Sequence, residues 1–436
     1  IVNDPVFNGT SNLRVYVGHD GGIERTDNIL TASQTSHWVN LNNGLGITQF
    51  YGGAAAQDGS RFIGGSQDND IPFKLASDPP NQWRTRIGAC CDGGFVAIDP
   101  SNPLRVYSET QNLAFIRSDD GGQSYVGATN GLLDANTNLT GFIAPFSMCN
   151  TFANIVVAGG KRLWRTVDGG DSWARIRDSL ASGSPCTAIK IGQANPNIVW
   201  AGYADGSLAR TSNGGLSWTA VTPSVRPASA VTSIAINPSN TSEVFVTYGA
   251  YTTGQVFLTT DNGSTWLNRS GTPPNAIPSI QVNSIVYHPS NDNWIYVGTD
   301  LGVLASEDKG LTWNITPRFT GNEGPVNVAV DELFWQGTQY LVAATHGRGM
   351  FRARILQTVY VDINNNGFED GTLQFPYNTI QEGINAAGNG SNISIKTGVY
   401  PQAPLTFSRR GMVMARDGTV VIRGSTNMPA NVERKK

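Results

Sequence analysis

The octapeptide TVDGGDSW at residues 166–173 is one of five copies of the pattern Ser/Thr-x-Asp-x-Gly-x-Ser/Thr-Trp or a close variant of it. The other copies are SDDGGQSY (118–125), TSNGGLSW (211–218), TTDNGSTW (259–266) and SEDKGLTW (306–313). The third position of the pattern recurs at intervals of 48, 45, 48 and 47 residues. A sequence that repeats itself at so regular a period is typical of a repeat architecture.

The residue types of the pattern indicate a tight turn. The carboxylate of the third position can accept hydrogen bonds from the backbone of its own turn, the Gly permits the bend, and the Trp can pack between sheets. A catalytic or calcium-binding role is the alternative for these carboxylates. Because an active site needs one copy and this motif recurs in every repeat, we expect a structural role for its third-position residues Asp120, Asp168, Asn213, Asp261 and Asp308.

Each period also contains several short apolar runs of strand length. In one period they are 282–287, 294–298 and 302–306, and the octapeptide leads into a fourth. Four antiparallel strands in about 45 residues describe a blade of a β-propeller. The composition agrees, because only 14% of the residues are charged and the chain holds 50 Gly, 22 Pro and 10 Trp. An all-β fold is therefore expected.

The octapeptides resemble the Asp-box (BNR) repeats of sialidases, xyloglucanase-like hydrolases, sortilin-type receptors and photosystem assembly propellers. The likeness extends to bacterial exported proteins of the sortilin-like type through VYVGHDGGI (15–23), NNGLGITQFYGG (42–53), FIGGSQDND (62–70), CCDGGFVAIDPSNP (90–103) and ATHGRGMF (344–351). Eroded units precede the five clear copies. The resemblance implies a propeller over residues 1–355 with seven or eight blades, the ring being closed by a strand from the N-terminus.

The repeating pattern of strands changes from Val359 onward. Residues 356–427 are similar to the N-terminal cap and first coils of pectin-lyase-like right-handed parallel β-helices, with 428–436 as a tail. We expect a helix capped by Asn378, with Gln381 at the capping-box position, running to about Ala387 and ended by Gly388. Strands are predicted at 393–396, 405–407, 412–415 and 420–423.

One segment of this second module suggests calcium. Side-chain oxygens at alternate positions, with a Gly at the sixth, can surround a hard cation. The twelfth position is Leu373 where an EF-hand has Glu, so a turn bonded to itself remains the alternative. The candidate ligands are Asp362, Asn364, Asn366 and Asp370.

A second group of polar residues follows the second strand of several units. The propeller pattern places these turns together at one face near the axis, where carboxylates, histidines and an arginine can form a site for a carbohydrate, a cation or a peptide. Asp-Gly turns that cap their own backbone are the alternative. The candidate residues are His19, Asp20, Asp68, Asp70, Asp92, Asp205, Asp300, His346 and Arg348.

The four cysteines, Cys90, Cys91, Cys149 and Cys186, lack metal-ligand spacing apart from the adjacent pair. One or two disulfides are expected in an oxidising compartment, with Cys90 or Cys91 joined to Cys149 or Cys186; a redox centre at the adjacent pair, or simple packing, stays open.

Charge and hydropathy restrict the kinds of partner and compartment that fit this chain. The net charge is −3 and the pI about 5.8, without a basic cluster beyond the terminal residues 434–436, which disfavours nucleic acid and anionic membranes as partners. No apolar run approaches the roughly 18 residues of a membrane span. Asn-x-Ser/Thr sequons suit an exported protein, and a chain that begins at Ile1 without Met suggests processing or a fragment. The sequons are at Asn8, Asn138, Asn240, Asn262, Asn268, Asn314, Asn389 and Asn392.

Three functions fit these observations. The first is an exported, non-catalytic binding or structural protein that presents a polar propeller face to a glycan or protein. The second is an extracellular glycoside hydrolase that uses an Asp pair on that face; sialidase activity is disfavoured because Arg-Ile-Pro is absent. The third is a scaffold in a larger surface assembly, or self-assembly through the β-helix. No cofactor is required apart from the calcium considered above.

Overall fold

A computed structural model describes the chain except for residues 20, 21, 35, 43, 89, 315–327, 356, 357, 368, 370, 372, 374, 388–390, 408–410 and 425–436. It divides into two compact units, Ile1–Ala353 and Arg354–Lys436. The division falls close to the domain boundary that the sequence suggests at residue 355.

The chain begins with a small antiparallel sheet in the order β1-β2-β3-β4. Its strands are β1 (Val2–Asn3), β2 (Val15–His19), β3 (Gly22–Thr26) and β4 (Val39–Asn40). β1 pairs with β2, with Val2 opposite Tyr16. The first strand of the chain therefore completes this sheet, whereas the sequence suggested that it closes a ring.

Seven antiparallel sheets follow within Phe50–Arg354 among the described residues, each formed by strands consecutive in the chain. The first three are β5 (Phe50–Ala55), β6 (Arg61–Ser66), β7 (Phe73–Leu75); β8 (Gly93–Ile98), β9 (Val106–Thr110), β10 (Ala114–Ser118), β11 (Val126–Gly127); and β12 (Phe146–Met148), β13 (Val156–Gly159), β14 (Leu163–Thr166), β15 (Ala174–Arg177). The next two are β16 (Cys186–Ile191), β17 (Val199–Tyr203), β18 (Leu208–Thr211), β19 (Thr219–Ala220); and β20 (Val231–Ile236), β21 (Val244–Tyr248), β22 (Val256–Thr259), β23 (Leu267–Asn268). The last two are β24 (Val282–His288), β25 (Asn291–Thr299), β26 (Gly302–Ser306); and β27 (Val330–Gln336), β28 (Tyr340–Thr345), β29 (Met350–Arg354).

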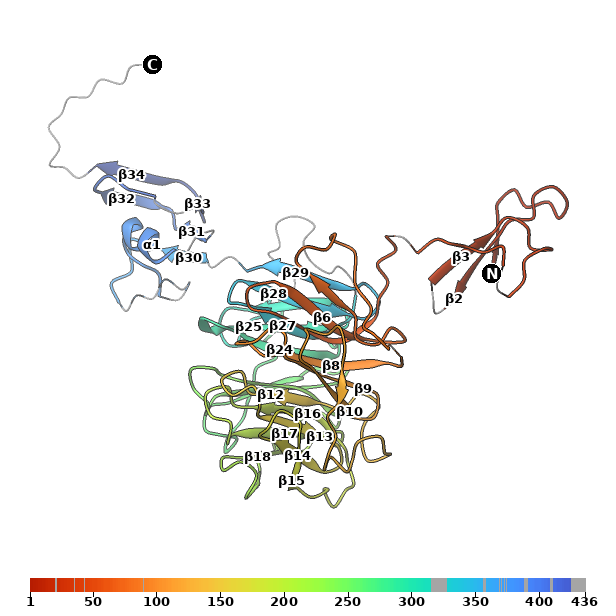
Figure 1. The fold of residues 1–436 in the computed structure, drawn as a ribbon. Coiled ribbons are helices and arrows are strands. Elements are labelled where there is room, and N and C mark those ends of the chain that lie inside the picture. Colours follow the sequence, from red (N-terminus) through yellow and green to blue (C-terminus); the bar gives the residue numbers. More distant parts are fainter. Residues whose placement is uncertain are drawn as a thin grey trace. The chain divides into compact units, whose positions relative to one another are not determined.

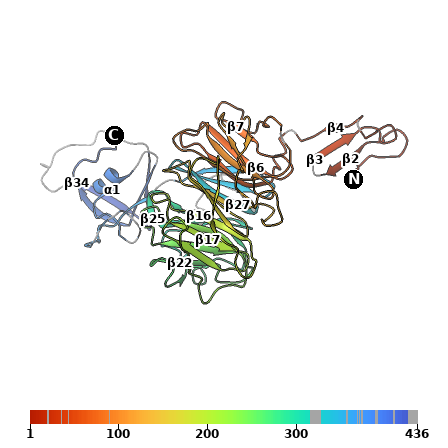
Figure 2. The same cartoon turned by 60° about the horizontal axis from the view of Figure 1, so that its bottom comes forward.

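The sheets close into a ring through their first strands. Each first strand contacts the first strand of the next sheet, from β5 and β8 to β24 and β27, and β27 contacts β5. In both ribbon views the first sheet, labelled at β6, lies beside the last sheet, labelled at β27 (Figures 1 and 2), and β5 makes the contacts with β27 and β28. An isolated bridge between Gln49 and His346 lies at this closure.

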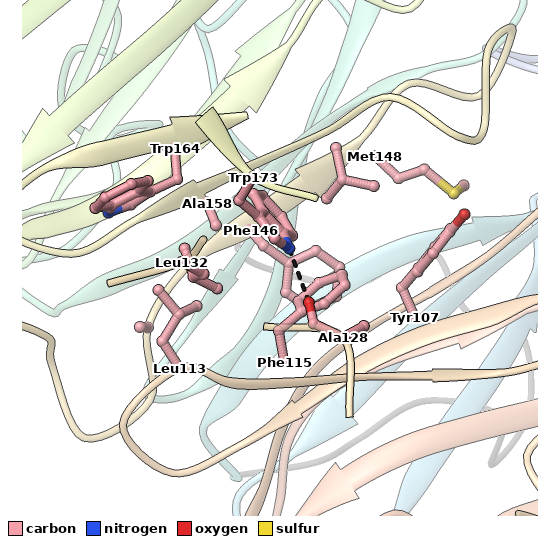
Figure 3. Close-up of a cluster of buried hydrophobic side chains, with 12 residues drawn as sticks. Tyr107, Leu113, Phe115, Ala128, Leu132, Phe146, Met148, Ala158, Trp164 and Trp173 are labelled. Atoms are coloured by element: carbon pink, nitrogen blue, oxygen red, sulfur yellow. Dashed lines mark hydrogen bonds between the residues drawn. The ribbon is translucent and has the colours of Figure 1, made fainter. Parts of the chain in front are cut away.

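The hydrophobic core is divided among the spaces between neighbouring sheets. One cluster contains Tyr107 and Phe115 from the second sheet and Phe146 and Trp164 from the third (Figure 3). Trp173, from the loop after β14, completes this cluster, and its indole N–H donates to the carbonyl of Ala128 at 2.8 Å. The alternating pattern of each strand thus buries both faces of most sheets, as stacked blades require.

The octapeptides form closed turns, which we call the repeat loops (118–125, 166–173, 211–218, 259–266 and 306–313). In the second loop Asp168 accepts the hydroxyl of Thr166 at 2.6 Å and the N–H and hydroxyl of Ser172 at 2.9 and 2.5 Å. In the third loop Asn213 makes the equivalent bonds and donates from Nδ2 to Ser217. The oxygens at this position are therefore occupied within their own loops.

Glycine allows the first two sheets to approach closely. A Cβ on Gly65 would lie 1.8 Å from the carbonyl oxygen of Gly94, and one on Gly93 would lie 2.2 Å from that of Asp70. Both distances are far below van der Waals contact, so any larger residue would push the two sheets apart.

The described residues of the second unit form parallel strands and one helix. β30 (Thr358–Val361), β31 (Asn392–Ile395) and β33 (Met412–Ala415) form one parallel sheet, and β32 (Gly398–Gln402) and β34 (Val420–Gly424) form another. The strand predicted at 405–407 is absent, and β32 was not predicted.

The helix of this unit, α1 (Ile380–Ala386), begins one residue later than expected. Its N-cap is Thr379 rather than Asn378, and the capping box uses Glu382 rather than Gln381. The Thr379 hydroxyl accepts the N–H of Glu382 at 3.2 Å, and the Glu382 carboxylate accepts the N–H of Thr379 at 3.1 Å. The helix ends before Ala387, and the predicted stop, Gly388, lies outside the described residues. Within the described part of the chain, no helix is both long and apolar enough to cross a membrane.

Candidate functional site

Register shifts near the start of six of the seven first strands determine which side chains lie at one end of the ring. In β5 the shift lies between Phe50 and Gly52, and in β27 between Val330 and Glu332, which leaves Tyr51 and Asp331 as the extra residues. A β-bulge of this kind turns a side chain in a new direction and is common beside functional sites.

The bulge residues of three consecutive sheets bond to the next sheet. Thr187 donates to the carbonyl of Val231 at 2.7 Å, and Thr232 donates to that of Val282 at 2.6 Å. The amide of Asn283 donates to the carbonyl of Val330 at 3.3 Å. These side chains therefore link the blades.

Asp331 interrupts this series, because an ionised carboxylate has no hydrogen to donate. Instead its Oδ2 lies 3.0 Å from Nδ1 of His346. Burial raises the pKa of Asp331; His346 opposes the rise, and the charge of Asp300 adds to it. Asp300 in turn accepts the hydroxyl of Tyr251 at 2.7 Å and the amide of Asn283 at 3.1 Å.

Tyr51 stands at the equivalent bulge of the neighbouring sheet. Its pKa is raised first by burial and then by the charges of Asp92, Asp68 and Asp331. The N–H of Asp68 donates to the Asp92 carboxylate at 2.8 Å, which fixes these two acids relative to each other. We refer to the set made by Tyr51, Asp68, Asp92, Asp300, Asp331 and His346 as the axial cluster.

A second pair of charges belongs to the same first strands. Glu332 accepts the N–H of Gly53 at 2.9 Å. Burial raises the pKa of Glu332 to about 7, against the opposing effects of that bond and of the Lys190 charge. Burial likewise lowers the pKa of Lys190. Each group is desolvated by the surrounding strands, so its charged form is destabilised.

The structure gathers four of the predicted face residues, Asp68, Asp92, Asp300 and His346, around Tyr51 and Asp331. Asp70 does not join them. Its carboxylate is buried and accepts the Nε–H of Arg86 and the N–H of Cys90, each at 2.7 Å.

The remaining predicted face residues make other contacts or lie outside the described chain. Asp205 caps its own turn by accepting the N–H and hydroxyl of Ser207 at 3.0 and 2.6 Å. His19 belongs to the N-terminal sheet, where its Nε2 lies 3.7 Å from Glu24. Arg348 is exposed, and its N–H donates to the hydroxyl of Thr345. Asp20 is outside the described residues.

The cysteines are not joined as expected, because all four are free. Cys149 and Cys186 are buried and direct their thiols to backbone carbonyls, Cys186 to Ala188 at 3.3 Å. Cys90 and Cys91 are exposed, with their sulfurs 2.6 Å apart.

The proposed calcium loop is partly occupied by other groups. Asp362 accepts the N–H of Asn364 at 3.0 Å with Oδ1 and the ammonium group of Lys396 at 2.7 Å with Oδ2. Asn366 is exposed, and Asp370 lies outside the described residues. Among the described residues, no three His, Cys, Asp or Glu side chains are grouped as a metal site.

A cavity of about 790 Å³ lies elsewhere in the ring, between residues 219–225, which follow the third repeat loop, and the fourth repeat loop. Its lining includes Arg210, Phe257 and Trp266 and contains no carboxylate. It therefore lacks the acid pair that glycosidic hydrolysis requires.

Sequence reasoning missed Tyr51 and Asp331. Tyr51 lies within the quoted segment 42–53, and Asp331 occupies the position that Thr187, Thr232 and Asn283 occupy in earlier repeats. Alignment of the repeats could have suggested Asp331 as the exception in a series of donors.

The ring of antiparallel sheets, with almost no helix, defines the protein as a β-propeller. A solved structure, YCF48 from Cyanidioschyzon merolae, is similar with a TM-score of 0.52 at 13% sequence identity, covering 70% of this chain and 95% of that one. An ancestral GH74 enzyme is similar with a TM-score of 0.46 at 17% identity, covering 65% of this chain and 40% of that one. No protein-family description and no curated protein matches the sequence. At so low an identity the likeness to YCF48 establishes the propeller fold alone.

Proposed function

We propose that this protein is an exported, non-catalytic binding protein that takes a carbohydrate at the axial cluster. The proposal includes a seven-bladed ring of the Asp-box class, followed by the start of a parallel β-helix. The observation that carries it is the pairing of two bulge side chains, Tyr51 and Asp331, with acids from neighbouring turns. An aromatic ring beside carboxylates offers both a surface for an apolar sugar face and acceptors for hydroxyl groups.

The bonding of the acids favours binding over catalysis. Asp92 accepts a backbone N–H from the turn of Asp68, and Asp300 accepts the hydroxyl of Tyr251 and the amide of Asn283. Carboxylates held in this way are rigid and already partly satisfied. They suit recognition, whereas a general acid or nucleophile has to exchange protons or bonds during turnover.

Binding can be tested on a glycan array followed by titration calorimetry. We expect Asp331→Asn to weaken the affinity for the retained glycan by about tenfold or more, because a hydrogen bond to a charged group contributes about 1.5–3 kcal/mol. Tyr51→Phe should also weaken it. Asp205→Asn is the matched control, since it changes an acid in the equivalent turn of another blade. Equal affinity for all four proteins, or no glycan bound by the wild type, would contradict the proposal.

Glycoside hydrolysis is a second candidate because of one observation at the same cluster. Burial raises the pKa of Asp331, the direction that a general acid needs, and Asp92 and Asp300 could supply the second carboxyl group. Release of reducing sugar from a polysaccharide panel tests this candidate. Turnover by the wild type that falls about a hundredfold or more in Asp331→Asn, while the glycan is still bound, would replace the binding proposal with the enzyme.

A further inference from the structure

The adjacent residues Cys90 and Cys91 lie in the connection between β7 and β8. Side chains of consecutive residues point to opposite sides of an extended strand, so neighbouring cysteines do not ordinarily meet. Here Cys91 has a φ of 77°, and the two sulfurs lie 2.6 Å apart. Both residues are exposed, in contrast to the buried Cys149 and Cys186.

The backbone of this pair is held by a buried anchor. The carboxylate of Asp70 accepts the N–H of Cys90 at 2.7 Å, and the N–H of Asp70 donates to the carbonyl of Cys91 at 3.1 Å. Asp70 is 2% exposed, and its ion pair with Arg86 measures 2.7 Å. These bonds, rather than the contact between the sulfurs, fix the turn that brings the two side chains to one side.

We propose that Cys90 and Cys91 form a redox modification site, at which a small disulfide such as oxidised glutathione reversibly joins them. One cysteine loses its proton and attacks the glutathione disulfide, forming a mixed disulfide and releasing one glutathione thiolate. The other cysteine then loses its proton and attacks the mixed disulfide, releasing the second. The two cysteines are oxidised, one glutathione disulfide is reduced to two thiols, and the two protons end on the glutathione thiolates.

The geometry makes this bond reversible. Consecutive Cα atoms across a trans peptide are about 3.8 Å apart, which is shorter than the roughly 4.4 Å at the lower end for ordinary disulfides. The described residues contain one cis peptide, Pro273–Pro274, so the Cys90–Cys91 peptide is trans. Strained and exposed disulfides are the more easily reduced ones. The pKa of the Cys91 thiol is raised, first by its hydrogen bond with Cys90. Because the thiolate is the form that attacks a disulfide, the exchange should become faster as the pH rises.

The full-length protein is equilibrated with graded ratios of oxidised to reduced glutathione, quenched by alkylation and digested for mass spectrometry. As the ratio of oxidised to reduced glutathione rises, we expect the peptide that contains both cysteines to change from a doubly alkylated form to an unalkylated form. The mass of that form is two hydrogens below the mass of the free dithiol peptide. Cys149→Ser should leave this transition unchanged. Cys90→Ser should abolish it, as should Cys91→Gly, in which glycine tolerates the positive φ.

The contribution of the folded structure to disulfide formation is tested by repeating this titration in denaturant. The folded chain holds both side chains on one side, so its midpoint should need an oxidised-to-reduced glutathione ratio about tenfold lower than the unfolded chain. Equal midpoints would overturn the inference. Stable glutathione adducts at the two cysteines, double alkylation at every ratio, or a bond to another cysteine would overturn it as well.

Discussion

Replacement of Asp70 by Asn should destabilise the propeller strongly, although the sequence suggested an exposed acid of the ligand-binding face. Asp70 is 2% exposed, and the side chain of its partner Arg86 is 11% exposed. Removing one partner of a buried ion pair leaves an uncompensated charge and costs about 3–5 kcal/mol. Asn keeps an acceptor for the N–H of Cys90 and tolerates the φ of 60°. We therefore expect a loss near the lower limit, about 3 kcal/mol.

The same turn provides the control. Asp68 has a φ of 55° and is exposed, so Asp68→Asn repeats the chemical change without burial. It should alter the free energy of unfolding by less than about 0.5 kcal/mol. The assay is urea unfolding followed by tryptophan fluorescence, repeated with Arg86→Gln and the double variant. A loss below about 1 kcal/mol for Asp70→Asn, or additive effects of the two substitutions, would refute the reasoning.

Substitutions at three further positions test the repeat loops and the first strands. Asp168→Ala should lower the free energy of unfolding by about 1–2 kcal/mol through lost turn bonds, whereas Asp168→Asn should cost less because Asn213 already serves in another loop; urea titration compares them. The hydrogen bonds within its loop, first that with the Ser172 hydroxyl, lower the pKa of Asp168 from 3.8 to about 2. The contribution of Asp168 to the free energy of unfolding is therefore full above pH 3.8 and disappears as the pH falls through about 2. Acid unfolding of the wild type and of Asp168→Asn should converge there. Trp173→Phe removes the indole bond to the preceding sheet and should cost about 1–2 kcal/mol in thermal unfolding, while an unchanged melting temperature would contradict that role. Burial raises the pKa of Glu332 from 4.5 to about 7, so its contribution to the free energy of unfolding is full below pH 4.5 and lost as the pH rises through 7. Glu332→Gln should therefore reduce the decline of the melting temperature between pH 5 and 8, an effect of about 3 kcal/mol at most. An unchanged pH profile would count against this.

The repeats made the propeller predictable, because the interval between octapeptides reports the length of one blade directly. The similarity to YCF48 and the ring of sheets confirm that fold. The helix near residue 380 was predicted one residue early, since Asn378 and Thr379 are both good caps and only Thr379 has Glu382 at the reciprocal position.

Four of the six residues of the axial cluster followed from the sequence, and two, Tyr51 and Asp331, did not. Turn residues such as Asp68, Asp300 and His346 could be placed at one end of the ring by their position after the second strand. Asp70 looks like Asp68 in the sequence, yet one carboxylate is buried against Arg86 and the other is exposed. That difference depends on a residue 16 positions along the chain, which local pattern does not reveal.

The sequence by itself determined the blade, its period and its internally bonded loops, because these depend on alternation of side chains and on contacts within a few residues. Only the tertiary structure decided which bulge side chains meet at the closure of the ring. Tyr51 and Asp331 are 280 residues apart and become neighbours because β27 contacts β5. The pairing of the N-terminal strand has the same physical reason. Whether β1 pairs with β2 or with the ring depends on competition between surfaces, which the local sequence does not encode.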